Sequence, residues 1–109
     1  MKKTVSAVIG VATLVFAAGA LADITKGQEK AKQVCGACHG ENGDKTLQPD
    51  YPTLAGQKRD YLVKVLNDYK SGARKNAIMG AQVKDLKPED IRDLAEWFSS
   101  RPGPLMVKH

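Results

Sequence analysis

Hydrophobic residues recur at helical spacing in three stretches of the chain, which are residues 24–34, 58–71 and 88–100. In the first stretch Ala31 and Val34 share one face. The second carries a stripe formed by Tyr61, Leu62, Val65, Leu66 and Tyr69, and the third carries Ile91, Leu94, Ala95 and Phe98. Each spacing predicts an amphipathic helix with a buried face. No segment alternates with period two over a strand's length, so we expect an all-α domain.

Residues at the ends of these stretches are typical helix start and stop signals. Thr25 with Gln28 three positions later has the spacing of a capping box, and Gly72 follows the second stripe as a C-terminal stop. Pro88 lies where the third helix should start. Gly27 lies inside the first helix and costs about 1 kcal/mol relative to Ala, so it requires a packing reason.

Between the helices, residues 40–56 and 72–84 show neither helical nor strand periodicity. The first of these contains the turn cluster 40–44 together with Pro49 and Pro52, and we expect an ordered loop anchored by Tyr51 and Leu54. The second contains Met79 and is also expected to be irregular. Residues 105–109 are expected to form a loose tail.

The first residues have the pattern of a secretory signal peptide. Lys2 and Lys3 form the charged region, residues 7–18 are apolar, and Ala20-Leu21-Ala22 is a small-residue cleavage site. The alternative is an uncleaved membrane anchor, because residues 5–22 carry no charge; their Ala and Gly content makes them a poor span. We expect a signal peptide over 1–22, a mature domain over 23–109, and export to the periplasm without stable membrane insertion.

Two cysteines and a histidine stand together in Cys35-Gly36-Ala37-Cys38-His39, the c-type haem attachment pattern. Two thiols three positions apart on one turn can each add to a vinyl group of the porphyrin, and His39 then projects toward the iron. A zinc site would need two further ligands, and His109 is the only other Cys or His in the chain. A redox dithiol would accompany a βαβ pattern, which is absent from the sequence. The motif therefore predicts one covalent haem c.

Size and charge agree with this reading. Removing the 22-residue leader from 109 residues leaves 87, too few to bury a large core, and a covalent porphyrin would serve as an apolar core element. Removal of Lys2 and Lys3 lowers the formal net charge from +5 to +3. The remaining lysines alternate with acidic residues, and no aromatic pattern accompanies them, so nucleic-acid binding has no support.

The second axial ligand of the haem iron has several candidates: Met79, Met106, His109 and, more remotely, lysines. Met79 is favoured because it lies 40 residues beyond His39 between two helices, where the chain can reach the opposite haem face. Met106 and His109 follow the Pro-bounded end of the last helix. The alternative role for Met79 is that of a gap-filling core residue.

Several segments taken together resemble the small bacterial class I cytochromes c, of the cytochrome c-553 kind and the related diheme kind. The resemblance covers essentially the whole mature chain. The segments that carry it are Cys35-Gly36-Ala37-Cys38-His39-Gly40, residues 51–57, Ile78-Met79-Gly80, residues 88–91 and residues 93–98.

The resemblance implies the class I cytochrome c fold, in which the N- and C-terminal helices cross and loops wrap one haem. His39 and Met79 would be the axial ligands, the Pro52 carbonyl would accept the imidazole N–H, and Leu54 would belong to the haem pocket. The helices would cross at Gly27 against Trp97. Lys87 departs from the family, which often has a Ser cap at this position.

These features predict a monomeric electron carrier, not an enzyme. An iron with imidazole and thioether ligands has no open position for a substrate, and the thioether favours the ferrous state. The expected partners are redox proteins such as membrane cytochrome complexes, dehydrogenases or oxidases. Two alternatives stay open: a haem c subunit of a larger dehydrogenase or oxidase, and a haem sensor or enzyme with a displaceable sixth ligand.

Overall fold

The computed structural model describes Gly10 and residues 21–106, so most of the predicted signal peptide and the candidate ligand His109 lie outside the described residues. Every regular element in the described part is helical, as expected. In chain order these are α1 (Ile24–Lys30), the π-helical turn η1 (Ala31–Cys35), α2 (Gly36–His39), α3 (Arg59–Ser71), α4 (Ala77–Val83) and α5 (Pro88–Ser99). None of the helices described is both long and apolar enough to cross a membrane.

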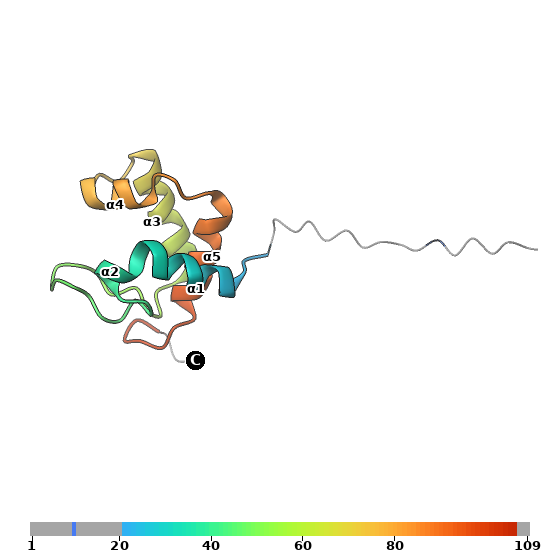
Figure 1. The fold of residues 1–109 in the computed structure, drawn as a ribbon, viewed down its shortest axis with the longest axis horizontal. Helices are drawn as coiled ribbons and strands as arrows, with labels where there is room; N and C mark the ends of the chain where they lie inside the picture. Colours follow the sequence, from blue (N-terminus) through green and yellow to red (C-terminus); the bar gives the residue numbers. More distant parts are fainter. Residues whose placement is uncertain (1–9, 11–20, 107–109) are drawn as a thin grey trace, which may run out of the picture.

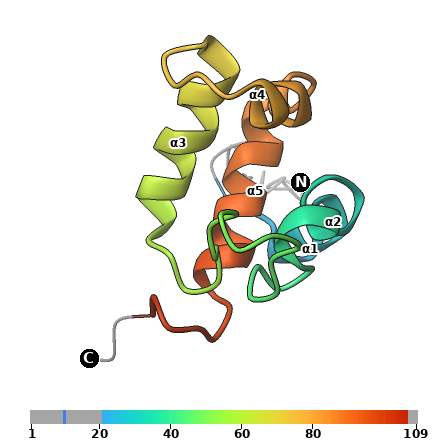
Figure 2. The same ribbon diagram turned by 90° about the vertical axis from the view of Figure 1, so that its left-hand side faces the viewer.

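The arrangement of these helices places α5 in the centre (Figures 1 and 2). Figure 2 shows α3 on one side of α5 and α1 with α2 on the other, while α4 lies near one end. The loop over residues 40–57 runs beside α2 and returns to the start of α3 (Figure 1).

The first helical segment differs from its prediction at both ends. Its N-cap is Asp23, not Thr25: the Asp23 carboxylate accepts hydrogen bonds from the backbone N–H groups of Thr25 and Lys26 at 3.0 and 3.1 Å. The helical path does not stop at Val34. It widens into η1, in which the Gly36 N–H donates to the Ala31 carbonyl, and then continues as α2 to His39. Such wide turns occur often at functional sites, and this one leads directly into the cysteine motif.

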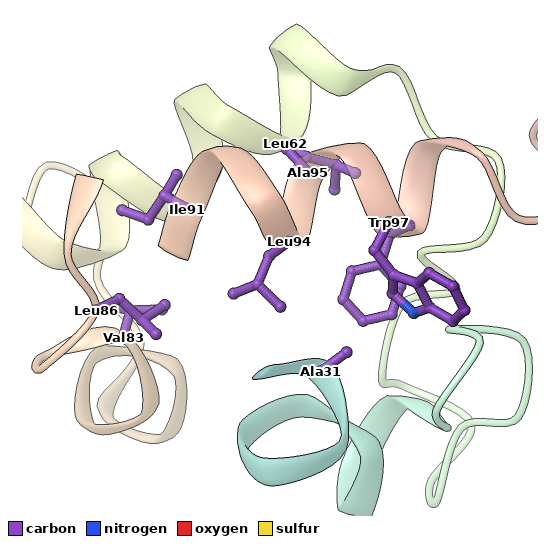
Figure 3. Packing of buried hydrophobic residues seen from close by; sticks show 9 residues of the cluster. Ala31, Leu62, Val83, Leu86, Ile91, Leu94, Ala95 and Trp97 are labelled. Carbon is purple, nitrogen blue, oxygen red and sulfur yellow. The ribbon is translucent and has the colours of Figure 1, made fainter. Parts of the chain in front are cut away.

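Helices α1 and α5 cross at Gly27, as the resemblance implies. A Cβ at Gly27 would lie 2.1 Å from the Asp93 carbonyl oxygen and 3.1 Å from the Trp97 Cβ, so only glycine fits this contact. An ion pair between Lys30 and Asp90, at 3.9 Å, also joins the two helices. In Figure 3, Leu94 and Trp97 project from α5 toward the helical segment that carries Ala31.

Helix α4 contradicts the prediction that residues 72–84 are irregular. The side chain of Asn76 accepts hydrogen bonds from the backbone N–H groups of Ile78 and Met79, both at 3.0 Å, and so caps a seven-residue helix. Asn is among the strongest N-caps, and this signal was available in the sequence. Met79 therefore lies on a capped helix, which holds it more firmly than an open loop.

The other helix ends follow the sequence signals more closely. Gly72 ends α3 with φ +85°, a left-handed conformation that suits glycine. At α5, Pro88 is the first residue, and the Asp90 carboxylate accepts the Lys87 N–H at 2.9 Å. This bond is the second half of a capping box, so the first turn of the helix is capped although Lys87 stands where the resemblance led us to expect Ser.

The long loop and the chain after α5 pack on the same end of the molecule. The indole N–H of Trp97 donates to the Glu41 carbonyl at 2.9 Å, and the Gly56 N–H donates to the Phe98 carbonyl at 2.9 Å. A Cβ at Gly56 would lie 2.6 Å from the Met106 nitrogen. The prediction of a loose tail is therefore wrong as far as Met106, which lies against the loop.

Candidate functional site

A cavity of about 510 Å³ lies between the cysteine motif, the loop over residues 50–57 and helices α3, α4 and α5. All six residues that the sequence analysis assigned to the site line this one cavity: Cys35, Cys38, His39, Pro52, Leu54 and Met79. They come from three segments that are far apart in the sequence, and only the folded chain brings them together.

His39 is held in one orientation at the end of α2. Its side chain is buried, with 6 % of its surface exposed, and its Nδ1 lies 2.9 Å from the Pro52 carbonyl oxygen. A carbonyl oxygen can only accept, so Nδ1 carries a proton, and in the neutral tautomer the lone pair then lies on Nε2. The ring of Tyr51 lies 6.1 Å away between centroids, tilted by 44°. The hydrogen bond thus orients the imidazole so that Nε2 can serve as the metal ligand.

Both cysteines are free thiols and are half-buried at the cavity wall. Burial, and secondarily the charge of Cys38, raises the pKa of the Cys35 thiol to about 12. The thiol is therefore protonated near neutral pH, and a neutral thioether at this position would suit the same surroundings.

Within the described residues, no three His, Cys, Asp or Glu side chains gather where they could hold a metal ion.

The two described methionines among the ligand candidates have different positions. Met79 is half-buried and lines the cavity, together with Ile78 and Gln82 of the same helix. Met106 is 40 % exposed and does not belong to the cavity lining; its backbone lies against Gly56.

The hydrophobic stripe of α3 has more than the ordinary core role that the sequence suggested. All five of its residues line the cavity: Tyr61, Leu62, Val65, Leu66 and Tyr69. The buried face of α5 contributes Leu94, Ala95 and Phe98 to the same wall. The spacing revealed which side chains share a face, but not that this face borders a cavity, because a helical pattern is the same beside a protein core and beside a cofactor.

Arg74 is a cavity-lining residue that the sequence reasoning did not identify. Its guanidinium lies 5.0 Å from the centre of the Tyr69 ring, and its pKa is raised, chiefly by a hydrogen bond with Tyr61. A lone arginine in an irregular stretch carries no sequence signal for this role. The packing of α3 against the 72–76 turn places it.

The cavity fits a c-type haem in size and chemistry. Its volume lies within the roughly 300–1,000 Å³ usual for sites that enclose small molecules and cofactors. Its walls are mainly aliphatic and aromatic, with two neighbouring thiols and one oriented imidazole on one side and a thioether on α4. Two thiols and an imidazole at this spacing are the donor set that a covalently attached haem requires.

Comparison with known proteins agrees with the site. The family model of cytochrome c matches residues 24–101. The chain belongs to the cytochrome c family. Family membership implies a covalent haem c with its iron and a role in electron transport.

Two curated relatives and one solved structure show the extent of the similarity. Cytochrome c4 of Pseudomonas aeruginosa is 41 % identical over 93 residues, which cover 85 % of this chain and 44 % of the relative. Cytochrome c-553 of Helicobacter pylori is 39 % identical over 98 residues, which cover 90 % and 96 % of the two chains. The crystal structure of reduced recombinant cytochrome c4 from Pseudomonas stutzeri superposes with a TM-score of 0.69 at 39 % identity, covering 76 % of this chain and 47 % of that one.

These matches confirm the class I cytochrome c fold. The chain spans less than half the length of the cytochrome c4 relatives, whereas it spans nearly all of the cytochrome c-553 relative.

Proposed function

We propose that this protein is a periplasmic one-electron carrier with a single haem c, attached through Cys35 and Cys38. His39 and Met79 would hold its iron. This chain contains two cysteines, and both belong to one attachment motif, which supports one haem for this chain.

One observation carries the proposal: the His39 imidazole and the Met79 side chain line the same cavity, and the imidazole is already oriented by Pro52. With Nδ1 bonded to a carbonyl, the free lone pair of Nε2 is the position available to iron. Leu54, from the same loop as Pro52, adds an apolar contact to the pocket wall.

The residues of the chain prepare the site for electron transfer without large movement. Haem iron, when bound, supplies the one-electron change between the ferric and ferrous states. The neutral thioether of Met79 favours the ferrous state and raises the potential. His39 is oriented by its hydrogen bond to Pro52, and the Met79 backbone is held by the Asn76 cap, so both side chains would need little movement when the iron changes charge. The apolar side chains of α3 and α5 exclude water.

Such a site fits a monomer that meets its redox partners transiently. Membrane cytochrome complexes, dehydrogenases and oxidases are the partner classes that can supply or remove single electrons. The site does not need a substrate pocket beside the iron, so the protein acts as a carrier and not as an enzyme.

Export of the chain belongs to the same proposal. Cleavage after Ala22 leaves residues 23–109 in the periplasm, where the haem is attached. Intact mass spectrometry of the exported protein should therefore give residues 23–109 plus one haem. A mass that includes Lys2 and Lys3 would instead support an uncleaved anchor.

The ferrous absorption spectrum with and without carbon monoxide tests the ligand set. We expect a reduced-minus-oxidised spectrum of a six-coordinate haem c, an iron–methionine band in the oxidised protein, and no change on addition of carbon monoxide. Rapid carbon monoxide binding by the wild-type protein would contradict the carrier proposal and favour a sensor or enzyme.

A further inference from the structure

A buried carboxylate on α5 lies outside the haem cavity and takes no part in the proposed electron transfer. Asp93 exposes 7 % of its surface, yet its Oδ1 accepts a hydrogen bond from the backbone nitrogen of Asp23 at 2.7 Å, across 70 positions of sequence. Asp23 is itself the N-cap of α1. The contact therefore joins the first residue before α1 to the middle of α5.

The nitrogen that Asp93 holds is the one that leader cleavage would change. The predicted cut lies between Ala22 and Asp23, and hydrolysis of that peptide bond turns the Asp23 amide nitrogen into a primary ammonium group. A cleft of about 440 Å³ surrounds this position. Its lining includes the two leader residues Leu21 and Ala22 and the charged residues Lys26, Glu89, Arg92 and Asp93.

We propose that Asp93 is a binding site for the α-ammonium group of the mature chain, so that cleavage after Ala22 converts a neutral hydrogen bond into a partly buried ion pair between α1 and α5. The inference rests on the proposed processing site, and it does not depend on the ligands of the haem iron.

The physical reason is the cost of burying a carboxylate. A buried carboxylate needs paired charge or several donors, and an amide offers one neutral N–H. An ammonium group offers three N–H donors and a full opposite charge, and hydrogen bonds between charged groups are roughly twice as strong as neutral ones. At 2.7 Å the nitrogen already occupies the position that the ammonium would take. Cleavage therefore adds charge and donors at a nitrogen that already contacts the carboxylate.

The position of the pair matters for the fold. Asp93 also provides the backbone carbonyl against which Gly27 packs, so the ion pair lies one helical turn from the closest approach of α1 and α5. The exported, processed protein should consequently be held together more tightly at this crossing than the unprocessed chain.

The test is a thermodynamic cycle on exported holoproteins. One background is the wild type. The other has a serine inserted between Ala22 and Asp23, so that processing leaves an amide at Asp23 and moves the ammonium one residue away. Asp93→Asn is made in both backgrounds, and intact mass establishes each N-terminus. The absorption spectrum establishes that the haem is in place.

We expect the serine extension to lower the melting temperature by roughly 4–8 °C, the shift for about 1 kcal/mol in a domain of this size. Asp93→Asn should lower the melting temperature of the wild type by a similar amount and that of the extended protein by much less. Glu89→Gln, which removes a charge from the same cleft, should have the same small effect in both backgrounds.

Three results would overturn the inference: a mature terminus other than Asp23, equal losses from Asp93→Asn in the two backgrounds, or coupling of Glu89→Gln as large as that of Asp93→Asn. If Asp93→Asn does not fold, equal melting temperatures of the wild-type and serine-extended proteins would overturn it alone. If the wild-type protein binds carbon monoxide, the electron-carrier proposal fails, but the outcome of this cycle is unaffected. Carbon monoxide binding probes the haem iron, whereas the melting temperatures probe the contact between Asp23 and Asp93.

Discussion

The two sides of α5 are packed in different ways. Toward α1 the contact is closed by protein atoms: Gly27 lets the backbones meet, and Trp97 is buried with its indole N–H bonded to Glu41. Toward α3 and α4 the side chains border a cavity, and residues such as Val65 and Leu66 are only half-buried. The α1 side is closely packed by protein atoms alone. The α3–α4 side borders a cavity that a haem would fill.

This difference indicates how a small chain can be stable. The predicted mature domain, residues 23–109, would have 87 residues and would bury too little surface for a large core. The α1–α5 crossing supplies a compact protein core, and the covalent cofactor would add apolar contacts for the side chains of α3 and α4 that border the cavity. The predictions below separate the two contributions, from the largest expected loss of stability to the smallest.

Replacing both Cys35 and Cys38 by Ala should remove the attached haem and with it the filling of the cavity. We expect a largely unfolded or degraded chain, because the α3–α4 side would lose its packing partner. Circular dichroism and thermal melting of the exported protein measure this. A cooperative transition near that of the holoprotein would show that the crossing alone sustains the fold.

Gly27→Ala tests the contact between α1 and α5. The new Cβ would lie 2.1 Å from the Asp93 carbonyl oxygen, so α1 and α5 must separate. Overpacking of this kind costs about 1–3 kcal/mol or more, and we expect the upper end because the obstacle is backbone. Urea unfolding of the holoprotein measures the loss.

Gly80→Ala is the matched control for this change. Gly80 lies in α4, and a Cβ there meets nothing within 4 Å among the described residues. Because Ala forms helix better than Gly by about 1 kcal/mol, stability should be unchanged or higher. Equal losses of stability from Gly27→Ala and Gly80→Ala would mean that the α1–α5 contact does not require a glycine.

Met79→Ala should have a moderate effect on stability and a large effect on the haem. The side chain is half-buried, so we expect a loss of about 1–2 kcal/mol, below that of a fully buried Met. If Met79 is the axial ligand, the midpoint potential should fall and carbon monoxide should bind, while the covalent haem stays in place.

Met106→Ala is the control for the ligand assignment, because Met106 is exposed and does not line the cavity. The midpoint potential and the absorption spectrum of Met106→Ala should match those of the wild-type protein. A spectral change in Met106→Ala combined with a normal spectrum in Met79→Ala would refute the assignment of Met79.

Trp97→Phe should give the smallest loss. The change keeps most of the aromatic surface and removes the hydrogen bond to the Glu41 carbonyl, which is worth about 1 kcal/mol. The haem spectrum and potential should stay constant, because Trp97 does not line the cavity. A shifted potential in this variant would indicate that the crossing and the haem side are coupled.

Much of this protein could be read from the sequence for local reasons. The cysteine motif, the stripes of α3 and α5, Pro88 and Gly72 each depend on residues a few positions apart, and the structure has helices where these signals predict them. The helix α4 was missed although its Asn76 cap was visible, because Gly80 and the short length weaken the helical pattern.

The contacts between distant segments could be decided only by the tertiary structure. The family resemblance anticipated the Gly27 crossing and the bond between His39 and Pro52, but neither follows from local pattern. The cavity role of the α3 stripe, the placement of Arg74 and the contact of Asp23 with Asp93 had no signal in the sequence. Local patterns determine which face of a helix is apolar, because that depends on the helical repeat alone. What the face meets depends on how all the helices pack together, and that is a property of the whole folded chain.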